Sequence, residues 1–356
     1  MVGIVGLAAA AALAFNVLVQ FERDPTVFAS FGEESVDITA YAEEQLSRDV
    51  LTRPALGHDG KYFFVLANDP WLIDPEENAL VIDRPRYRAQ RMFYPVVASA
   101  GGTLEADTII WTLLITNVIA MGLGTWAVAT LASDMGGSPW WGLAFVLNIG
   151  FISEQNIDGA GVVAAAAAFW AIVLLRRERI AWAVALLTVS ALSREAMLIA
   201  AAGSAFWLWR RGEKARATWA VTLPTATAVV WAVFVRLRLG FGDETAEIQE
   251  IGLPFVGLVE AFDLWLDDPV DLAAGLAILL LLALFTRRAL GSDELVGWAF
   301  LGFVPLALLF TRQVWASYFD ISRAVAPAIT AFILLAFVVG PPDRQRENTP
   351  YVTERP

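Results

Sequence analysis

Long apolar runs separated by short polar connections make up most of this chain. The first run, residues 2–20, has about the 20 residues that a helix needs to cross the hydrocarbon core of a bilayer. Nine more follow a long polar segment, at about residues 108–131, 140–152, 159–175, 181–192, 196–209, 219–235, 272–285, 295–310 and 321–339. This pattern predicts an all-α polytopic membrane protein with about ten transmembrane helices.

The overall composition agrees with a membrane location. Hydrophobic residues make up 57% of the 356 residues, and the mean hydropathy is +0.58. Soluble domains are typically only about 45–50% apolar. The formal net charge is -12, which argues against a nucleic-acid partner. The lipid bilayer is therefore the expected environment.

Two features of the apolar runs qualify this interpretation. Several runs are shorter than a full crossing, which predicts helix ends that reach a polar cavity, because irregular backbone at membrane depth needs protein or water partners. Residues 2–20 also have the length of a signal peptide. They lack a positively charged start and a clean small-residue cleavage site, which favours a retained helix.

The arginine-rich short connections set the expected orientation. They fall on one side if there are about ten spans, so that side is cytoplasmic by the positive-inside rule. Both termini then lie inside and residues 21–107 form a large extracytoplasmic loop. We expect one transmembrane domain over residues 1–340, with a second extracytoplasmic segment at 240–269 and a disordered cytoplasmic tail at 341–356.

The extracytoplasmic segments are expected to contain surface helices. Apolar side chains at Val36, Tyr41 and Leu46 alternate with acids and predict an amphipathic interfacial helix. A short helix is expected at residues 62–67, before the turn-rich Asn68-Asp69-Pro70. Residues 256–266 form another amphipathic piece, expected to lie on the membrane surface.

The residue types limit the chemistry that a single chain can perform. No cysteine is present, which excludes disulfides, thiolate nucleophiles and cysteine-ligated metals. The only histidine is His58, so Ser-His catalysis and multi-histidine metal sites are nearly excluded. We expect no cofactor, and a divalent metal, although possible, has no supporting motif. Carboxylates, arginines and hydroxyls are left.

Ionisable side chains gather at the predicted extracytoplasmic ends of the spans. Such residues are costly in a membrane and usually act in function or pair with one another. The group comprises Asp59, Arg88, Arg91, Glu154, Asp158, Arg194, Glu195, Asp320 and Arg323. Their convergence predicts a polar site on that side.

Each of these residues also has a purely structural interpretation. Asp59 stands before a helical run and is a candidate helix cap. Arg194 and Glu195 are a candidate local ion pair at a helix junction. Asp320 and Arg323 have the i,i+3 spacing of a helix-surface pair.

Carboxylates beside arginines are suited to group transfer from a phosphate. A carboxylate takes the proton from an attacking hydroxyl. Arginines hold the departing phosphate and neutralise its growing charge. A cavity beside the bilayer admits a phosphate carried on a long lipid.

A family resemblance rests on short motifs spread along the chain. In the first polar segment they are Asp59-Gly60 with an aromatic pair and Ala67-x-Asp69-Pro70, then Tyr87-Arg88-x-Gln90-Arg91-x-x-Tyr94-Pro95. This segment resembles the first periplasmic loop of bacterial GT-C polyprenyl-phosphate-sugar glycosyltransferases, in particular the branch of predicted membrane mannosyl- or glycosyltransferases. Later landmarks of that branch are similar to Ser193-Arg194-Glu195 and Trp315-x-x-Tyr318-x-x-x-Ser322-Arg323-x-x-x-Pro327.

The resemblance implies an inverting transfer of a sugar from a polyprenyl-phosphate donor to an extracytoplasmic glycan, glycolipid or protein. It implies that Asp59 is the catalytic aspartate of the first loop, which we expect to act as the general base. Together with the convergence of charged residues described above, it predicts substrate binding at His58, Lys61, Tyr62, Arg88, Gln90, Arg91, Tyr94, Glu154, Asp158, Arg194, Glu195, Tyr318 and Arg323.

The chain departs from the family pattern at two points. His58 stands where an aromatic residue is common, and Asp59 is a single acid rather than one of an adjacent pair. The departure leaves a metal-dependent mechanism without support. Two rival functions are a lipid-linked substrate transporter or flippase and a non-catalytic subunit that binds a lipid-linked glycan.

Overall fold

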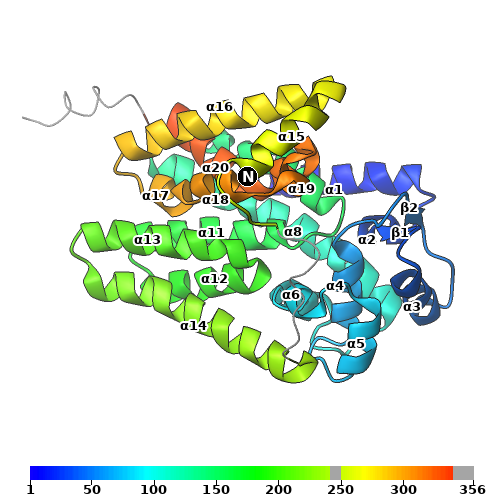
Figure 1. The fold of residues 1–356 in the computed structure, drawn as a ribbon. Coiled ribbons are helices and arrows are strands. Elements are labelled where there is room, and N and C mark those ends of the chain that lie inside the picture. The colour runs from blue at the N-terminus through cyan, green and yellow to red at the C-terminus, as the bar shows by residue number, and fades with distance from the viewer. Residues whose placement is uncertain (241–249, 340–356) are drawn as a thin grey trace, which may run out of the picture.

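The computed structural model describes residues 1–240 and 250–339, and almost all of its regular structure is helical (Figure 1). The predicted all-α class is therefore confirmed for the described residues. Residues 241–249 of the second expected extracytoplasmic segment, and the expected tail at 341–356, lie outside them.

Every predicted apolar run forms helix, but the helices differ in length. Five are long and apolar enough to cross a membrane: α1 (Val2–Gln20), α8 (Ala106–Asp134), α14 (Lys214–Leu239), α16 (Pro269–Gly291) and α20 (Tyr318–Phe337). Shorter apolar helices are α11 (Gly161–Arg176), α12 (Ile180–Ser193) and the interrupted pair α17 (Leu295–Leu301) and α18 (Phe303–Leu309).

The two remaining runs are not single α-helices, because each includes a short 3₁₀ helix. Residues 139–155 form η1 (Pro139–Gly142), α9 (Leu143–Val146) and α10 (Ile149–Gln155), and the short η2 (Glu195–Met197) leads into α13 (Leu198–Arg210). The expected short helices are thus present, while ten full crossings stay a prediction.

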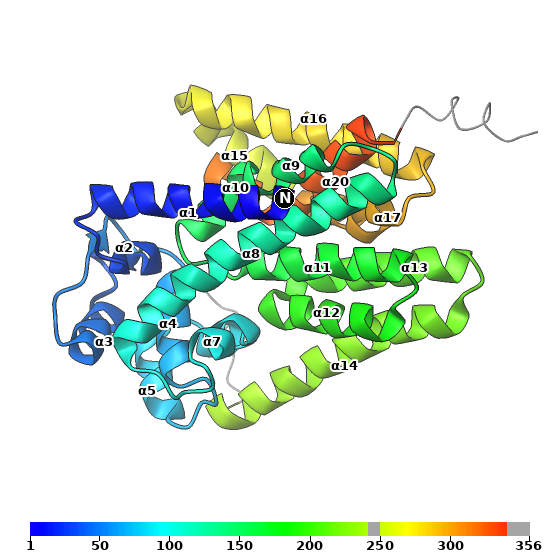
Figure 2. The same ribbon diagram turned by 180° about the vertical axis from the view of Figure 1, so that it is seen from behind.

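The helices pack around α8 and α11. Helix α8 contacts α1 and α11, α11 contacts α12, and α14 packs against α12 and α13. On the other side, α16 and α17 pack against α20, which also contacts α10 (Figures 1 and 2). Small residues permit the closest approach: a Cβ at Gly6 of α1 would lie 2.5 Å from the Thr125 side chain of α8. Close contact through small residues is typical of helix pairs in membranes.

The first polar segment is a folded part of the protein. It contains α2 (Thr26–Ala29), α3 (Val36–Leu46), α4 (Gly60–Asn68), α5 (Pro75–Val81), α6 (Pro85–Arg88), α7 (Phe93–Ala98) and the short parallel strands β1 (Phe31–Gly32) and β2 (Thr52–Arg53). Helix α4 is buried from Gly60 to Ala67. Helices α3 and α4 confirm the expected helices near Tyr41 and at residues 62–67.

The polar segment lies at one end of the bundle. Figure 1 shows α3, α4, α5 and α6 gathered there, with the α13–α14 and α16–α17 connections at the opposite end. Helices α15 (Val256–Asp267) and α19 (Arg312–Trp315) pack against each other. Val259, Phe262 and Leu266 of α15 are exposed, as a helix lying on a membrane surface requires.

Candidate active site: an arginine-lined cavity

A polar cavity of about 270 Å³ lies where the first polar segment meets the helix bundle. Its walls come from segments far apart in the sequence, which fold together only in the tertiary structure. Its charged lining consists of Asp59, Asp83, Arg84, Arg88, Arg91, Arg194, Glu250, Asp320 and Arg323. Five arginines and four carboxylates therefore face one small space.

Asp59 is held by arginines from two separate parts of the chain. Its Oδ1 accepts a hydrogen bond of 2.6 Å from Arg88 Nη1, and its Oδ2 accepts one of 3.4 Å from Arg91 Nη1. Arg323 Nη2 of α20 lies 3.6 Å from the same Oδ2. The carboxylate thus joins the first polar segment to the last helix.

The side chain of Asp59 does not cap a helix, so the capping interpretation is wrong. Asp59 occupies the N-cap position of α4, but its side chain makes no capping hydrogen bond. Burial alone would raise the pKa of Asp59, but the charges of Arg88, Arg91 and Arg323 outweigh burial and hold that pKa below its usual range. The carboxylate is therefore ionised at neutral pH.

Arg194 and Glu195 point to different partners, so the expected local ion pair between them is absent from the described ion pairs. Arg91 binds Glu195 with two hydrogen bonds, Nη2 to Oε1 at 2.8 Å and Nε to Oε2 at 3.0 Å. Arg194 Nη1 donates to Glu154 Oε1 at 2.9 Å. The Ser193–Glu195 junction consequently connects two clusters instead of closing on itself.

Glu154 belongs to α10 and lies behind the cavity, with its carboxylate next to the first residue of α11. Its Oε2 accepts the backbone N–H of Gly161 at 3.0 Å, which places the carboxylate at a helix N-terminus. A Cβ at Gly159 would lie 2.0 Å from Glu154 Oε2. Glycine at this position is thus a steric requirement for the carboxylate to reach the helix end.

Arg323 is the common partner of three carboxylates. Its Nε donates to Glu154 at 3.1 Å and its Nη1 to Asp320 at 3.2 Å, while its Nη2 faces Asp59. The i,i+3 pair with Asp320 is confirmed. Because the planar guanidinium offers donors in several directions, one side chain holds the whole group together.

Aromatic rings flank the arginines. The Arg88 guanidinium lies 4.4 Å from the Tyr62 ring centroid, and Arg91 lies 4.6 Å from that of Tyr87. His58 lines the cavity and packs against Phe319, with ring centroids 5.2 Å apart. Burial, joined by the charge of Arg323, lowers the pKa of His58 to about 4. The imidazole is therefore neutral at pH 7.

Seven residues predicted to bind substrate do not line this cavity. Two of them, Glu154 and Glu195, bind arginines of the cavity. The other five make different contacts. Lys61 Nζ donates to Ser35 and to the Leu56 carbonyl, which ties α4 to the preceding loop. The backbone N–H of Tyr318 donates to Asp271. Gln90 is half-buried outside the cavity wall.

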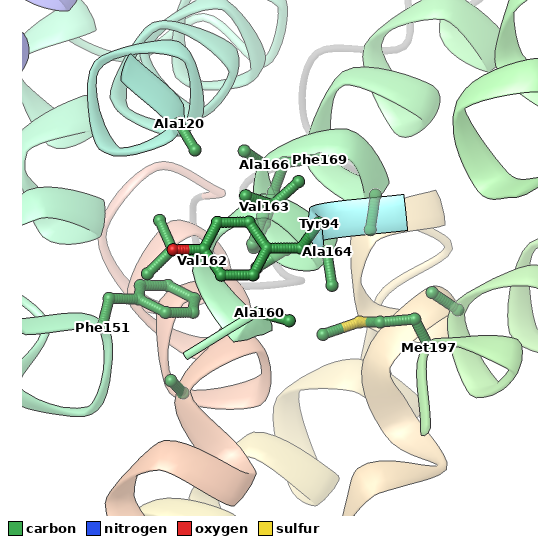
Figure 3. Close-up of a cluster of buried hydrophobic side chains, with 14 of the residues drawn as sticks. Tyr94, Ala120, Phe151, Ala160, Val162, Val163, Ala164, Ala166, Phe169 and Met197 are labelled. Atoms are coloured by element: carbon green, nitrogen blue, oxygen red, sulfur yellow. The ribbon is translucent and has the colours of Figure 1, made fainter. Parts of the chain in front are cut away.

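The other two lie in the protein interior. Figure 3 shows Tyr94 among Ala120, Phe151 and Val163. Its hydroxyl donates to the Leu113 carbonyl and accepts from Asn117. Asp158 is also fully buried. Their positions favour a structural role for both.

Several residues that line the cavity or contact its lining were not among the predicted site residues. Asp83 binds Arg88 at 3.0 Å, and the Tyr87 hydroxyl donates to Glu250 at 2.8 Å. Gln313 of α19 completes one wall. Asp83 lies just before the Arg88 motif and Tyr87 is its first residue, so both were within reach of sequence reasoning. Glu250 and Gln313 carry no local signal.

The arrangement is suited to binding an anion beside a proton acceptor. Ion pairs already engage the cavity arginines, so an entering phosphate has to exchange with carboxylates for these donors. Among the described residues, no group of three or more histidine, aspartate or glutamate side chains is arranged to hold a metal ion.

No family model, curated protein or solved structure matches this chain. The fold and the site therefore define only its class. It is a helical protein with several helices able to span a membrane and a partly buried cluster of arginines and carboxylates at one end.

Proposed function

We propose that this protein is a GT-C-type membrane glycosyltransferase that moves a sugar from a polyprenyl-phosphate donor to an extracytoplasmic acceptor, with inversion. The observation that carries the proposal is the position of Asp59, a single ionised carboxylate held by Arg88, Arg91 and Arg323 in one cavity. The site then faces the outside of the cell membrane, and the bundle crosses it about ten times.

In the proposed reaction the arginines bind the phosphate of the donor. The phosphate takes over guanidinium donors that Asp59 engages before the donor binds. Release from three positive charges raises the proton affinity of the Asp59 carboxylate, because nearby cations favour its charged form. Donor binding and activation of the base are thereby coupled.

Sugar transfer then follows as one displacement. Asp59 accepts the proton of the acceptor hydroxyl while the acceptor oxygen forms a bond to the anomeric carbon. The bond between that carbon and the phosphate oxygen breaks, and the phosphate leaves with the electron pair. The arginines stabilise the charge that develops on it. Attack opposite the leaving group inverts the anomeric carbon.

A transporter is the first rival function. A transport path through the membrane favours polar breaks in both halves of the bundle, with related repeats. The cavity described above lies at one end of the bundle (Figure 1), between the first polar segment and the start of α20. This one-sided polarity favours the transferase.

The direct test is binding of the lipid carrier without its sugar. Purified protein in detergent is titrated with a polyprenyl monophosphate and, separately, with the matching polyprenol. We expect the phosphate form to bind at least about tenfold more tightly, since a hydrogen bond to a charged group contributes about 1.5–3 kcal/mol. Equal affinity for both lipids would exclude the cavity as a phosphate site.

A second measurement separates an enzyme from a non-catalytic binding subunit. Polyprenyl-phosphate donors carrying different labelled hexoses and pentoses are incubated with the protein and a cell-envelope extract as the acceptor source. We expect label to move from at least one donor into lipid-free or glycan material. Tight carrier binding without transfer from any donor would support the binding subunit instead.

A further inference from the structure

An apolar groove of about 550 Å³ lies on the bundle away from the cavity, between α13, α16 and the α17–α18 pair. Its walls include Ile199, Phe206, Trp298, Leu301 and Val304. The groove occurs beside the interruption between α17 and α18, where the helix breaks at Gly302. Its surface is apolar, and it flanks a helix that belongs to the predicted membrane region.

One end of this groove carries a positive charge. Arg210, in the last turn of α13, lies over the Trp298 ring with its guanidinium 4.7 Å from the ring centroid. Arg210 has no carboxylate partner among the described residues. Two other arginines at this end of the bundle are neutralised: Arg176 by Glu294, and Arg211 by Asp293.

The groove also contains an unsatisfied hydrogen-bond donor. The indole Nε1 of Trp298 is buried and has no hydrogen-bond partner in the described part of the chain. A buried tryptophan N–H usually finds an acceptor. The groove thus combines an apolar channel, an exposed cation at its end and a donor in its wall.

We propose that this groove binds an acyl chain of an anionic phospholipid whose phosphate pairs with Arg210. Basic pockets between transmembrane helices at the cytoplasmic side are suited to anionic headgroups, and Arg210 lies at the end predicted to be cytoplasmic. An acyl chain matches the apolar walls, and the phosphate supplies the anion that Arg210 lacks. The lipid is separate from the proposed donor, which binds at the other end.

The test uses full-length protein in mild detergent, with phosphatidylglycerol and phosphatidylcholine as probes. Native mass spectrometry measures how much of each lipid remains bound. We expect phosphatidylglycerol to be retained preferentially and Arg210→Ala to reduce that preference about fivefold, as expected for one basic residue near an anionic lipid surface. Arg179→Ala is the matched control, because Arg179 is exposed at the same end but away from the groove.

A second pair of variants tests the groove itself. Ala202 lines the groove and is exposed, so Ala202→Trp fills it without disturbing the core. We expect this variant to lose retained phosphatidylglycerol, while Ala185→Trp on the exposed face of α12 keeps it. Equal retention of both lipids by the native protein, or unchanged retention in both Arg210→Ala and Ala202→Trp, would overturn the proposal. So would a dimer whose contact covers the groove.

Discussion

Arg88 Nη1 donates a hydrogen bond of 2.6 Å to Asp59 Oδ1, across 29 positions of sequence. This contact joins the two motifs of the first polar segment and fixes Asp59 beside the arginines. It also means that Asp59 is a weak base while these arginines hold it, since positive neighbours stabilise its ionised form. In the proposed mechanism the donor phosphate relieves this restraint.

The charge state of His58 offers a test of that coupling. His58 is the only histidine in the chain, so its imidazole signal needs no assignment in a histidine-labelled NMR sample. We expect it to stay neutral at pH 6 and to titrate near pH 4, because burial and Arg323 lower its pKa. On addition of polyprenyl monophosphate the pKa should rise, as the phosphate offsets the charge of Arg323.

The lowered pKa of His58 also predicts that the stability of the protein depends on pH. The pKa of His58 in the folded protein is below its unfolded value of about 6.5, so the unfolded state binds more protons between these two pH values. Stability from this group is therefore fully present above about pH 6.5 and is lost as the pH falls towards 4. Thermal unfolding of His58→Gln should show a shallower loss over this range. The same pH dependence of stability in His58→Gln and the native protein would contradict the lowered pKa of His58.

Phosphate binding by Arg323 is predicted to depend on the shape of its guanidinium group. The guanidinium of Arg323 contacts Glu154, Asp320 and Asp59 at the same time. A lysine at this position would keep the charge but could not make all three contacts. We expect Arg323→Lys to weaken binding of polyprenyl monophosphate about tenfold or more, the value of one charge-assisted hydrogen bond. Arg312→Lys, on the exposed surface of α19, is the matched control. Unchanged affinity at Arg323→Lys would remove this arginine from the phosphate site.

Glu154 is predicted to act mainly in stability. It is buried and holds both Arg194 and Arg323, and removing one partner of a buried ion pair costs about 3–5 kcal/mol. Glu154→Ala should lower the free energy of unfolding by that amount, measured by denaturant titration in detergent. Glu44→Ala, on the exposed face of α3, should change it little. A small effect at Glu154 would show that the arginines find other partners.

The orientation of the bundle is open to chemical labelling, because the chain contains no cysteine. Single cysteines replace Gln45 in α3 and Arg179 between α11 and α12, both exposed positions at opposite ends. An impermeant thiol reagent added to intact cells should label the cysteine at 45 and not the one at 179. The reverse pattern would place the cavity on the cytoplasmic side.

Much of the fold follows from the hydrophobic pattern. Each apolar run became helix, because a long apolar sequence without strong breakers has few other ways to satisfy its backbone in a membrane. Which helices cross fully is harder to predict. Breaks such as the one at Gly302 depend on the packing of neighbouring helices, which a local pattern does not contain.

The candidate site was predictable in outline only. The convergence of Asp59, Arg91 and Arg323 follows from their common position at one side of the spans. The pairing does not: Glu195 binds Arg91 instead of its sequence neighbour Arg194, and this choice depends on the relative placement of α6, α7 and η2. Tyr94 was predicted to bind substrate because of its place in the motif. Its hydroxyl instead points into the core, and nothing in the motif indicated this.

The central claim is that Asp59 takes the proton from the acceptor, and Asp59→Asn tests it most directly. Asparagine keeps the shape of the side chain but cannot serve as this proton acceptor. The measurement is label transfer from the polyprenyl-phosphate donor that the native protein uses, with donor binding measured in parallel. Asp74→Asn is the control, because Asp74 does cap α5 through the Glu77 N–H and asparagine caps nearly as well. We predict a fall in transfer of about 10²–10⁴-fold with donor binding retained; a folded Asp59→Asn protein that transfers sugar at the native rate would contradict the account.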